Sequence, residues 1–406
     1  MDVNEPLALL AGLSPAQFMR RHWQKKPLLV RQAIPGFKPL LSRSALFKLA
    51  SREQVESRLI TKQLKGWRMA QGPVAPRSLP PLSQKAWTLL VQGVDLHEPS
   101  AHALLQKFRF VPDARLDDLM ISFATAGGGV GPHFDSYDVF LLQASGRRRW
   151  KIGRQKDLSL QEGVPLKILQ NFEPEEEFVL EAGDMLYLPP RYAHDGIAET
   201  AMQADGKAAD CMTYSIGFRS PGHSELASEL LQRLAEFSEE GGDDPASGGG
   251  RSAKATVLYR DPGQAATATP AALPASLAVF AGQAVQEALK DPLALACVLG
   301  EYMTEPKASV WFDEAVHEWD ADSAQAGQSG VRLDPRTRMM YDSDHVFING
   351  ESYRAKGADA SLMRRLADQR SLAPRELRKA GAAALALLGD WHDAGWLRQE
   401  LPPAES

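Results

Sequence analysis

Three residues of the chain have the types and the spacing needed to hold a non-haem iron ion. His133 and Asp135 stand two residues apart in GGGVGPHFDSYDVF (127–140), and residues i and i+2 of a strand point to the same face. An imidazole and a carboxylate can therefore aim at one point inside a barrel. His194, in MLYLPPRYAHDGIA, follows His133 by 61 residues and provides a second imidazole from a later strand. Two histidines and one carboxylate, with the remaining positions open, form the facial triad of iron(II) oxygenases, so the pattern predicts an Fe(II) site.

A histidine followed two residues later by a carboxylate is a weak signal when it stands alone. Of the nine histidines, only His133 and His223 have such a partner, Asp135 and Glu225. The pair at His223 lies where a helix is expected to begin and has no later partner, which indicates a solvent-exposed pair. The alternative to a metal site is that His133 and Asp135 form a buried pair that satisfies each other's hydrogen bonds, or that they are two exposed loop residues. The strand context and His194 together favour the metal site.

The elements that must position these residues are short strands. Between about residue 86 and residue 220, runs of strand composition alternate with turns marked by Gly, Pro and Asp. The runs are AWTLLVQGV, DLMISFATA, DVFLLQA, RRRWKIG, EFVLEAGDMLYLP and CMTYSIGFRS. Because no helices intervene, the pattern predicts an antiparallel barrel or sandwich rather than βαβ units.

Helical segments are expected before this region. Residues 14–23 should form a short helix capped by Ser14, and residues 26–34 should form a strand. Residues 44–59 have the pattern of an amphipathic helix.

The chain becomes helical again after Pro221. An apolar stripe at helical spacing is followed by the polar, glycine-rich stretch 239–250, for which we expect a flexible linker. Two more helices are expected around LPASLAVFAGQAVQEAL and LALACVLGEYM. From about residue 309, the hairpin-like run RMMYDSDHVFINGESYRA and the helical runs SLMRRLADQ and APRELRKAGAAALALLGDWHDAGW predict a small winged-helix-like module.

Composition narrows the class of protein. The 406 residues are 44% apolar and 24% charged, as in globular proteins. No run approaches the roughly 18 apolar residues of a membrane span, and no signal peptide is expected at the start. Cys211 and Cys297 stand far apart, which excludes a disulfide framework or a zinc knuckle and predicts a cytoplasmic protein. The net charge of −5 does not indicate direct nucleic-acid binding.

Three motifs carry a family resemblance: GPHFDSYDVFLLQASGRRRWKIG, GDMLYLPPRYAHDGIA and CMTYSIGFRSP. Together they resemble the JmjC-type bacterial ribosomal oxygenases, and the opening QKKPLLVRQAI and the tail extend the resemblance over essentially the whole chain. The resemblance implies a double-stranded β-helix (cupin) core and a requirement for Fe(II), 2-oxoglutarate and O2. It also implies a homodimer that hydroxylates an arginine of large-subunit ribosomal protein sixteen.

The resemblance and the patterns together imply a chain of mixed α and β structure with three regions. Residues 1–221 are expected to form a JmjC/cupin oxygenase domain with a helical lead-in. Residues 222–304 are expected to form a helical dimerisation region, and residues 305–406 a winged-helix-like C-terminal domain.

The family pattern also places a basic residue against the distal carboxylate of 2-oxoglutarate. Arg148, the middle arginine of GRRRW, matches that position. In a strand, Arg148 and Trp150 share one face, while Arg147 and Arg149 share the other. The planar fork of arginine suits a carboxylate. The alternative is that all three arginines form a solvated or RNA-binding edge.

Polar residues near the motif are further candidates for ligand binding. Ser122 and Ser215 interrupt apolar strands, so either hydroxyl can complete the cosubstrate pocket or simply bond to backbone. Tyr137 and Asp138, just past the metal motif, are candidates to face the substrate. Asp195 is a further carboxylate that could hold a guanidinium. The alternative is that these are ordinary strand-edge residues.

Two other functions remain open. A JmjC-type demethylase of methylated lysine or arginine shares the same initial oxidation, so the motif alone does not separate it from a hydroxylase. A non-catalytic cupin interaction module would be favoured by the loss of a metal ligand or of the cosubstrate arginine, and all of these are present.

Overall fold

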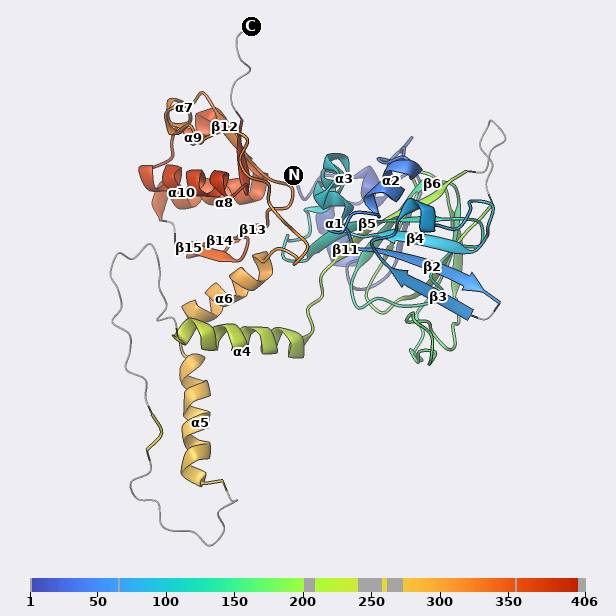
Figure 1. The fold of residues 1–406 in the computed structure, drawn as a ribbon, viewed down its shortest axis with the longest axis horizontal. Coiled ribbons are helices and arrows are strands. Elements are labelled where there is room, and N and C mark those ends of the chain that lie inside the picture. The colour runs from blue at the N-terminus through green and yellow to red at the C-terminus, as the bar shows by residue number, and fades with distance from the viewer. Residues whose placement is uncertain are drawn as a thin grey trace. The chain divides into compact units, whose positions relative to one another are not determined.

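The computed structural model describes residues 2–64, 66–200, 209–239, 258–260, 273–354 and 356–400. It contains two compact units, Met1–Ser220 and Pro221–Ser406, which are considered one at a time (Figure 1). Of the expected linker, residues 240–250 lie outside the described part of the chain. Within the described part, no helix is long and apolar enough to cross a membrane.

The first unit is built on two antiparallel β-sheets. The larger sheet has the strand order β1-β9-β6-β11-β5-β4-β2-β3, and the smaller one has the order β10-β7-β8. The strands are β1 (Leu28–Val30), β2 (Ser57–Gln63), β3 (Gly66–Gln71), β4 (Trp87–Val91), β5 (Leu116–Ala124), β6 (Val139–Ser145), β7 (Arg148–Gly153), β8 (Glu176–Leu180), β9 (Met185–Leu188), β10 (Ala193–Ala198) and β11 (Cys211–Phe218). The expected antiparallel core is confirmed.

The two sheets meet in an apolar layer. Alternate residues of β6 and β9 point from the larger sheet toward alternate residues of β7, because side chains on a strand have a period of two. The buried members of this layer are Val139, Leu141, Leu186 and Leu188 from the larger sheet and Trp150, Ile152 and Leu180 from the smaller one.

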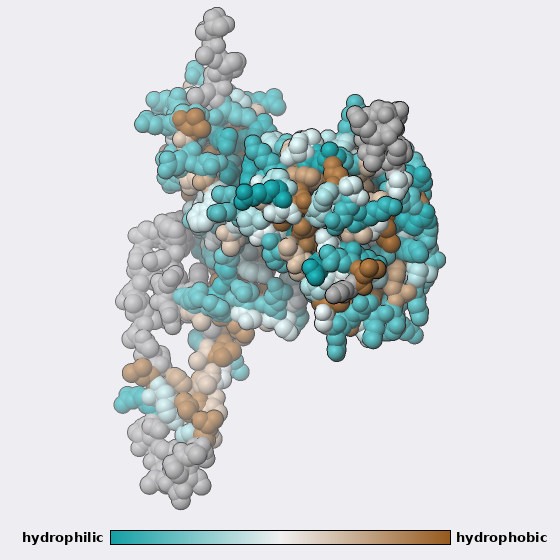
Figure 2. Space-filling view, turned by 45° about the vertical axis from the view of Figure 1, so that its right-hand side comes forward, coloured by the Kyte–Doolittle hydropathy of each residue, from teal (hydrophilic) through white to brown (hydrophobic). Residues whose placement is uncertain are grey.

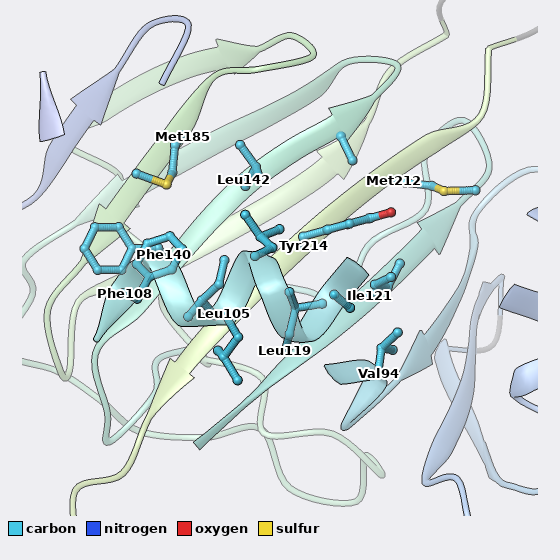
Figure 3. Packing of buried hydrophobic residues seen from close by; sticks show 14 of the residues in the cluster. Val94, Leu105, Phe108, Leu119, Ile121, Phe140, Leu142, Met185, Met212 and Tyr214 are labelled. Atoms are coloured by element: carbon cyan, nitrogen blue, oxygen red, sulfur yellow. The ribbon is translucent and has the colours of Figure 1, made fainter. Parts of the chain in front are cut away.

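The opposite face of the larger sheet is covered by helices, which are α1 (Pro15–Arg21), α2 (Arg43–Leu49) and α3 (Pro99–Leu105). Figure 3 shows Leu105 and Phe108 packed over Leu119, Phe140 and Tyr214. Each such side chain contributes about 1.5–3 kcal/mol when it is fully buried. This layer holds the large sheet rigid on the side away from the smaller sheet.

The helix expected over residues 14–23 forms as α1. The side chain of Ser14 accepts a hydrogen bond from the backbone N–H of Gln17, and the backbone N–H of Ser14 donates to Oε1 of Gln17. This capping box, with Pro15 in the first turn, satisfies backbone donors that the helix leaves unpaired.

The helix expected over residues 44–59 is wrong in its second half. Helix α2 ends at Leu49, and Ser57 already begins β2. Strand β2 lies between β4 and β3, so its backbone is paired on both sides. These long-range pairings outweigh the helix propensity of the polar residues before Ser57.

The second unit begins with three helices, as expected: α4 (His223–Glu239), α5 (Ala275–Ala288) and α6 (Pro292–Thr304). Asp291 caps α6 through its side chain, which accepts hydrogen bonds from the N–H groups of Leu293 and Ala294. The C-terminal module follows, with α7 (Ala321–Ala326), α8 (Gly357–Gln369), α9 (Pro374–Leu377), α10 (Ala382–Asp393), β12 (Gly330–Leu333), β13 (Met339–Tyr341), β14 (His345–Ile348), β15 (Glu351–Arg354), β16 (Ser371–Leu372) and β17 (Leu397–Glu400).

Helix α6 packs directly on the hairpin of that module. The Ser352 hydroxyl donates to Glu301 at 2.6 Å. A Cβ atom on Gly300 would lie only 2.4 Å from the ring of Phe347, so the helix and β14 are in close contact. The helices that were expected to form a separate region, 222–304, therefore share one compact unit with the C-terminal module.

Candidate metal centre

The three residues of the predicted triad come together in the first unit. The candidate ligand atoms of His133, Asp135 and His194 all lie within 4.8 Å of one another, and no other such group of three occurs in the described part of the chain. His194 lies on β10, and His133 pairs with it in an isolated antiparallel bridge. The backbone N–H of each histidine donates to the carbonyl of the other, at 2.9 and 2.8 Å.

The two imidazoles are oriented by backbone carbonyls. Nδ1 of His133 lies 2.9 Å from the carbonyl oxygen of Gly131, and Nδ1 of His194 lies 2.9 Å from that of Tyr192. A carbonyl can only accept, so both Nδ1 atoms must donate. Each Nε2 then keeps its lone pair, which is the arrangement that metal-binding histidines need.

The charge state of His194 also suits a metal ligand. Its side chain is buried, and the burial, together with the nearby His133, lowers the pKa of His194 to about 4. The imidazole is therefore neutral near pH 7. The Asp135 carboxylate lies 3.7 Å from Nε2 of His194 and completes a set of two nitrogen donors and one oxygen donor. Such a set fits Fe(II).

The segment before His133 needs glycine. Gly131 has a φ of +82°, and a Cβ atom there would lie 3.0 Å from Ile168 and 3.1 Å from Trp67. Trp67 belongs to β3, so the hairpin of β2 and β3 helps to wall the site. The strand patterns of the sequence did not predict this hairpin, although Gly66, at the turn before Trp67, is a usable signal.

Arg148 lies on the inner face of β7, as the alternation predicted. Residues 148, 150 and 152 are buried, whereas residues 149 and 151 are partly exposed. Arg148 is only 4% exposed, yet its Nε and Nη2 atoms have no hydrogen-bond partner within the described residues. A buried guanidinium with unpaired donors is costly unless an anion pairs with it. The site therefore fits a carboxylate ligand at this position.

Arg149 points the other way. It forms ion pairs with Glu177 and Glu199 on the outer side of the smaller sheet. Arg147 also lies near Glu199, at 3.6 Å.

The two serines lie on the larger sheet, on the face toward Arg148. Ser215 is the cross-strand partner of Leu141, which belongs to the apolar layer between the sheets. Ser122 is the partner of Thr213, two residues before Ser215. Ser122 donates to the backbone carbonyl of Thr213 at 3.3 Å, so its hydroxyl has a partner inside the fold.

The candidate substrate residues are placed differently from one another. Tyr137 is 39% exposed, and its pKa is raised by desolvation and then by the neighbouring carboxylates, Asp135 first. Asp138 is fully buried. It accepts hydrogen bonds from Tyr187 at 2.5 Å and Gln24 at 3.1 Å, and it pairs with Arg115 at 3.3 Å.

Two of the sequence-based expectations therefore need correction. The Asp138 carboxylate is occupied by partners of the fold and does not reach a substrate. Asp195 pairs across the sheet with Lys151, on the strand face opposite to that of His194, although it stays within electrostatic reach of His133 and Arg148. Both residues were chosen for their nearness in sequence, whereas strand alternation and burial decide where they point.

Comparisons with known proteins agree with this geometry. A family model for the JmjC domain matches residues 103–226, and one for a ROXA-like winged helix matches residues 287–398. The chain is 35% identical to the ribosomal protein uL16 3-hydroxylase of Escherichia coli, over 82% of this chain and 84% of that protein. It is 37% identical to a probable ribosomal oxygenase of Haemophilus influenzae, over 53% of this chain and 52% of that protein.

Solved structures show the same likeness. The X-ray structure of E. coli YcfD superposes with a TM-score of 0.78 at 28% identity, covering 95% of this chain and 98% of that one. A structure of the same ribosomal oxygenase in complex with cobalt and 2-oxoglutarate superposes with a TM-score of 0.74, at 28% identity and with the same coverage.

Proposed function

Because the chain belongs to the JmjC-domain ribosomal oxygenases, we propose that it is an Fe(II)- and 2-oxoglutarate-dependent hydroxylase of an arginine in ribosomal protein uL16. The observation that carries this proposal is the convergence of His133, Asp135 and His194 in the same unit as a buried Arg148 with unpaired donors. A relative that matches over 82% of this chain and 84% of its own length is named for hydroxylation of uL16.

The side chains divide the work between metal, cosubstrate and substrate. The two Nε2 atoms and the Asp135 carboxylate would hold Fe(II), and Arg148 would pair with the distal carboxylate of 2-oxoglutarate. Ser122 and Ser215 would line the same pocket. When bound, iron and 2-oxoglutarate supply the oxidising chemistry, which uses O2 and releases succinate and CO2.

The protein must also hold the reacting carbon near the metal and keep competing reactions out. Tyr137, partly exposed beside the metal motif, is the residue we propose to contact the substrate. The carboxylates of Asp135, Asp118 and Asp117 act on its hydroxyl, with Arg58 acting in the opposite sense, and a carboxylate beside the hydroxyl suits an incoming guanidinium.

A demethylase is the second candidate. Some relatives are named bifunctional lysine-specific demethylase and histidyl-hydroxylase, and one from Drosophila persimilis is 27% identical to this chain. That match covers only 47% of this chain and 29% of that protein. The match to the uL16 hydroxylase covers 82% of this chain and 84% of that protein, and this favours hydroxylation.

The expected product is an arginine of uL16 that is 16 Da heavier. Incubation of purified uL16 with the protein, Fe(II), ascorbate and 2-oxoglutarate, followed by fragment mass spectrometry, measures it. The matched control is the His194→Ala protein, which should leave uL16 unmodified. Oxidation of a histidine or lysine instead would contradict the substrate assignment, and loss of 14 Da from a methylated residue would contradict the hydroxylase.

We also propose that the protein is a homodimer that associates through its helices. None of the described side chains of α5 is buried, and Figure 2 shows apolar side chains gathered along this helix. Val279 is 59% exposed and Val285 is 54% exposed. Apolar side chains exposed along a helix in this way are unfavourable in water without a partner.

Charges on α5 should therefore split the dimer. The double variant Val279→Asp, Val285→Asp is expected to run as a monomer in multi-angle light scattering, while the wild-type chain has twice that mass. Val316, which is 90% exposed in a loop, provides the control, because Val316→Asp should leave the mass unchanged. A dimer that survives the double variant would place the interface elsewhere.

Direct nucleic-acid binding is not part of this proposal. Helix α10 follows α9 after a short turn, where a recognition helix would lie in a helix-turn-helix. It contains no Lys or Arg, and its exposed charged residues are Asp390 and Asp393.

The proposed ribosomal substrate and the two free cysteines support a cytoplasmic location.

A further inference from the structure

Trp150 lies between the two groups that the proposed function needs most. The pairing of β7 with β10 places Arg148 opposite Ala198, Trp150 opposite Gly196 and Ile152 opposite His194. Trp150 is therefore midway, along the strand, between the level of the cosubstrate arginine and the level of the metal ligand. Successive inward residues of a strand are about 6.6 Å apart, so the outer two levels are about 13 Å apart at the backbone, and the Arg148 side chain must reach past Trp150 to share one small dicarboxylate with the metal.

The indole of Trp150 packs against Gly196, the residue opposite it on β10, which has no side chain. A Cβ atom on Gly196 would lie 2.5 Å from Cζ3 and 2.6 Å from Cη2 of the indole. The six-membered ring thus fills the space that glycine leaves on β10. Trp150 is 5% exposed, and a ring packed in this way has little freedom to turn.

From this position the ring contacts both functional groups. Its centroid lies 5.8 Å from that of the His194 imidazole. Arg148 lies two residues before Trp150 on the same strand. Its Cζ atom is 5.8 Å from the centroid of the Trp150 ring, within the range of a cation–π contact. One rigid ring therefore lies beside both the candidate metal ligand His194 and the arginine proposed to bind the cosubstrate, Arg148.

The indole also carries an unpaired donor. Trp150 Nε1 is buried and, within the described residues, has no hydrogen-bond partner, like Nε and Nη2 of Arg148. Three unpaired N–H donors on the inner face of one strand are unusual, because buried donors are almost always paired. A ligand with several acceptor oxygens would satisfy them.

We propose that Trp150 is a positioning residue of the cosubstrate pocket, one that sets Arg148 against the distal carboxylate and donates a hydrogen bond from Nε1 to a cosubstrate oxygen. This inference rests on the proposed function.

The test measures binding in the full-length protein, loaded with Mn(II) under argon so that no turnover occurs. Calorimetry gives the Kd for 2-oxoglutarate, and the resonance of free Mn(II) gives the Kd for metal. Trp150→Phe keeps an aromatic ring but removes the N–H, so the Kd for 2-oxoglutarate should rise about tenfold or more. The Kd for Mn(II) should change little, since all three ligands remain.

Trp391→Phe is the matched control. Trp391 is also a buried tryptophan, 1% exposed, but it lies in the second unit, so its loss should not alter the Kd for 2-oxoglutarate.

Gly196→Ala is the second test variant. It leaves Trp150 in the chain but pushes the indole aside, and it should weaken 2-oxoglutarate binding and raise the KM for it more than it lowers kcat.

A double-mutant cycle separates positioning from general stability. If Trp150 acts partly through Arg148, Trp150→Phe should have a much smaller effect in the Arg148→Ala protein than in the wild type. Fully additive effects, or an unchanged Kd in folded Trp150→Phe, would overturn the inference. Failure of the wild-type protein itself to bind 2-oxoglutarate would instead overturn the proposed function.

Discussion

Replacement of His133, Asp135 or His194 by alanine is expected to abolish succinate formation from 2-oxoglutarate. The described part of the chain contains no second cluster of metal-ligating groups, so no neighbour can take over from a missing ligand. Purified variants should also contain much less iron than the wild type. Succinate measured by coupled assay and iron measured by mass spectrometry test both statements.

His223→Ala is the control for these variants. His223 has the same spacing to a carboxylate, Glu225, but it is an exposed residue at the start of α4. Its removal should leave iron content and turnover unchanged. Wild-type turnover by His194→Ala would show that the third ligand has been assigned to the wrong residue, and iron loss in His223→Ala would point to a second site.

Arg148→Ala is expected to raise the KM for 2-oxoglutarate by about ten- to a hundredfold, while iron content stays close to that of the wild type. A charge-assisted hydrogen bond is worth about 1.5–3 kcal/mol, and the buried Arg148 has two donor atoms without a partner among the described residues. Steady-state kinetics with 2-oxoglutarate as the varied substrate measure the change.

Arg149→Ala is the matched control, because it removes the same charge from the adjacent position of the same strand. Its guanidinium is bound by Glu177 and Glu199 on the outer face, so the KM for 2-oxoglutarate should hardly move. Arg148→Lys should recover part of the affinity, since lysine keeps the charge but not the fork. An unchanged KM in Arg148→Ala would transfer the carboxylate contact to another residue.

The sequence by itself determined the three candidate metal ligands and the strand face on which Arg148 lies. The spacing of His133 and Asp135, together with the later His194, was enough to identify them, because residues two apart on a strand lie on the same face. The same alternation separated Arg148 from Arg149. Local caps and apolar stripes also predicted α1, α4, α5 and α6, since helix signals lie within a few residues of the helix they describe.

Only the tertiary structure decided which neighbours in sequence are neighbours in space. Asp138 follows the metal motif directly, yet its burial against Tyr187, Gln24 and Arg115 gives it a structural role. The expected helix over 44–59 overlapped only the start of β2, and the β2–β3 hairpin was missed because its stability comes from pairing with β4, which lies further along the chain. Trp150 acquires its place between Arg148 and His194 from the register with Gly196. Register depends on pairing between distant strands and on the packing of both faces, and no local pattern contains that information.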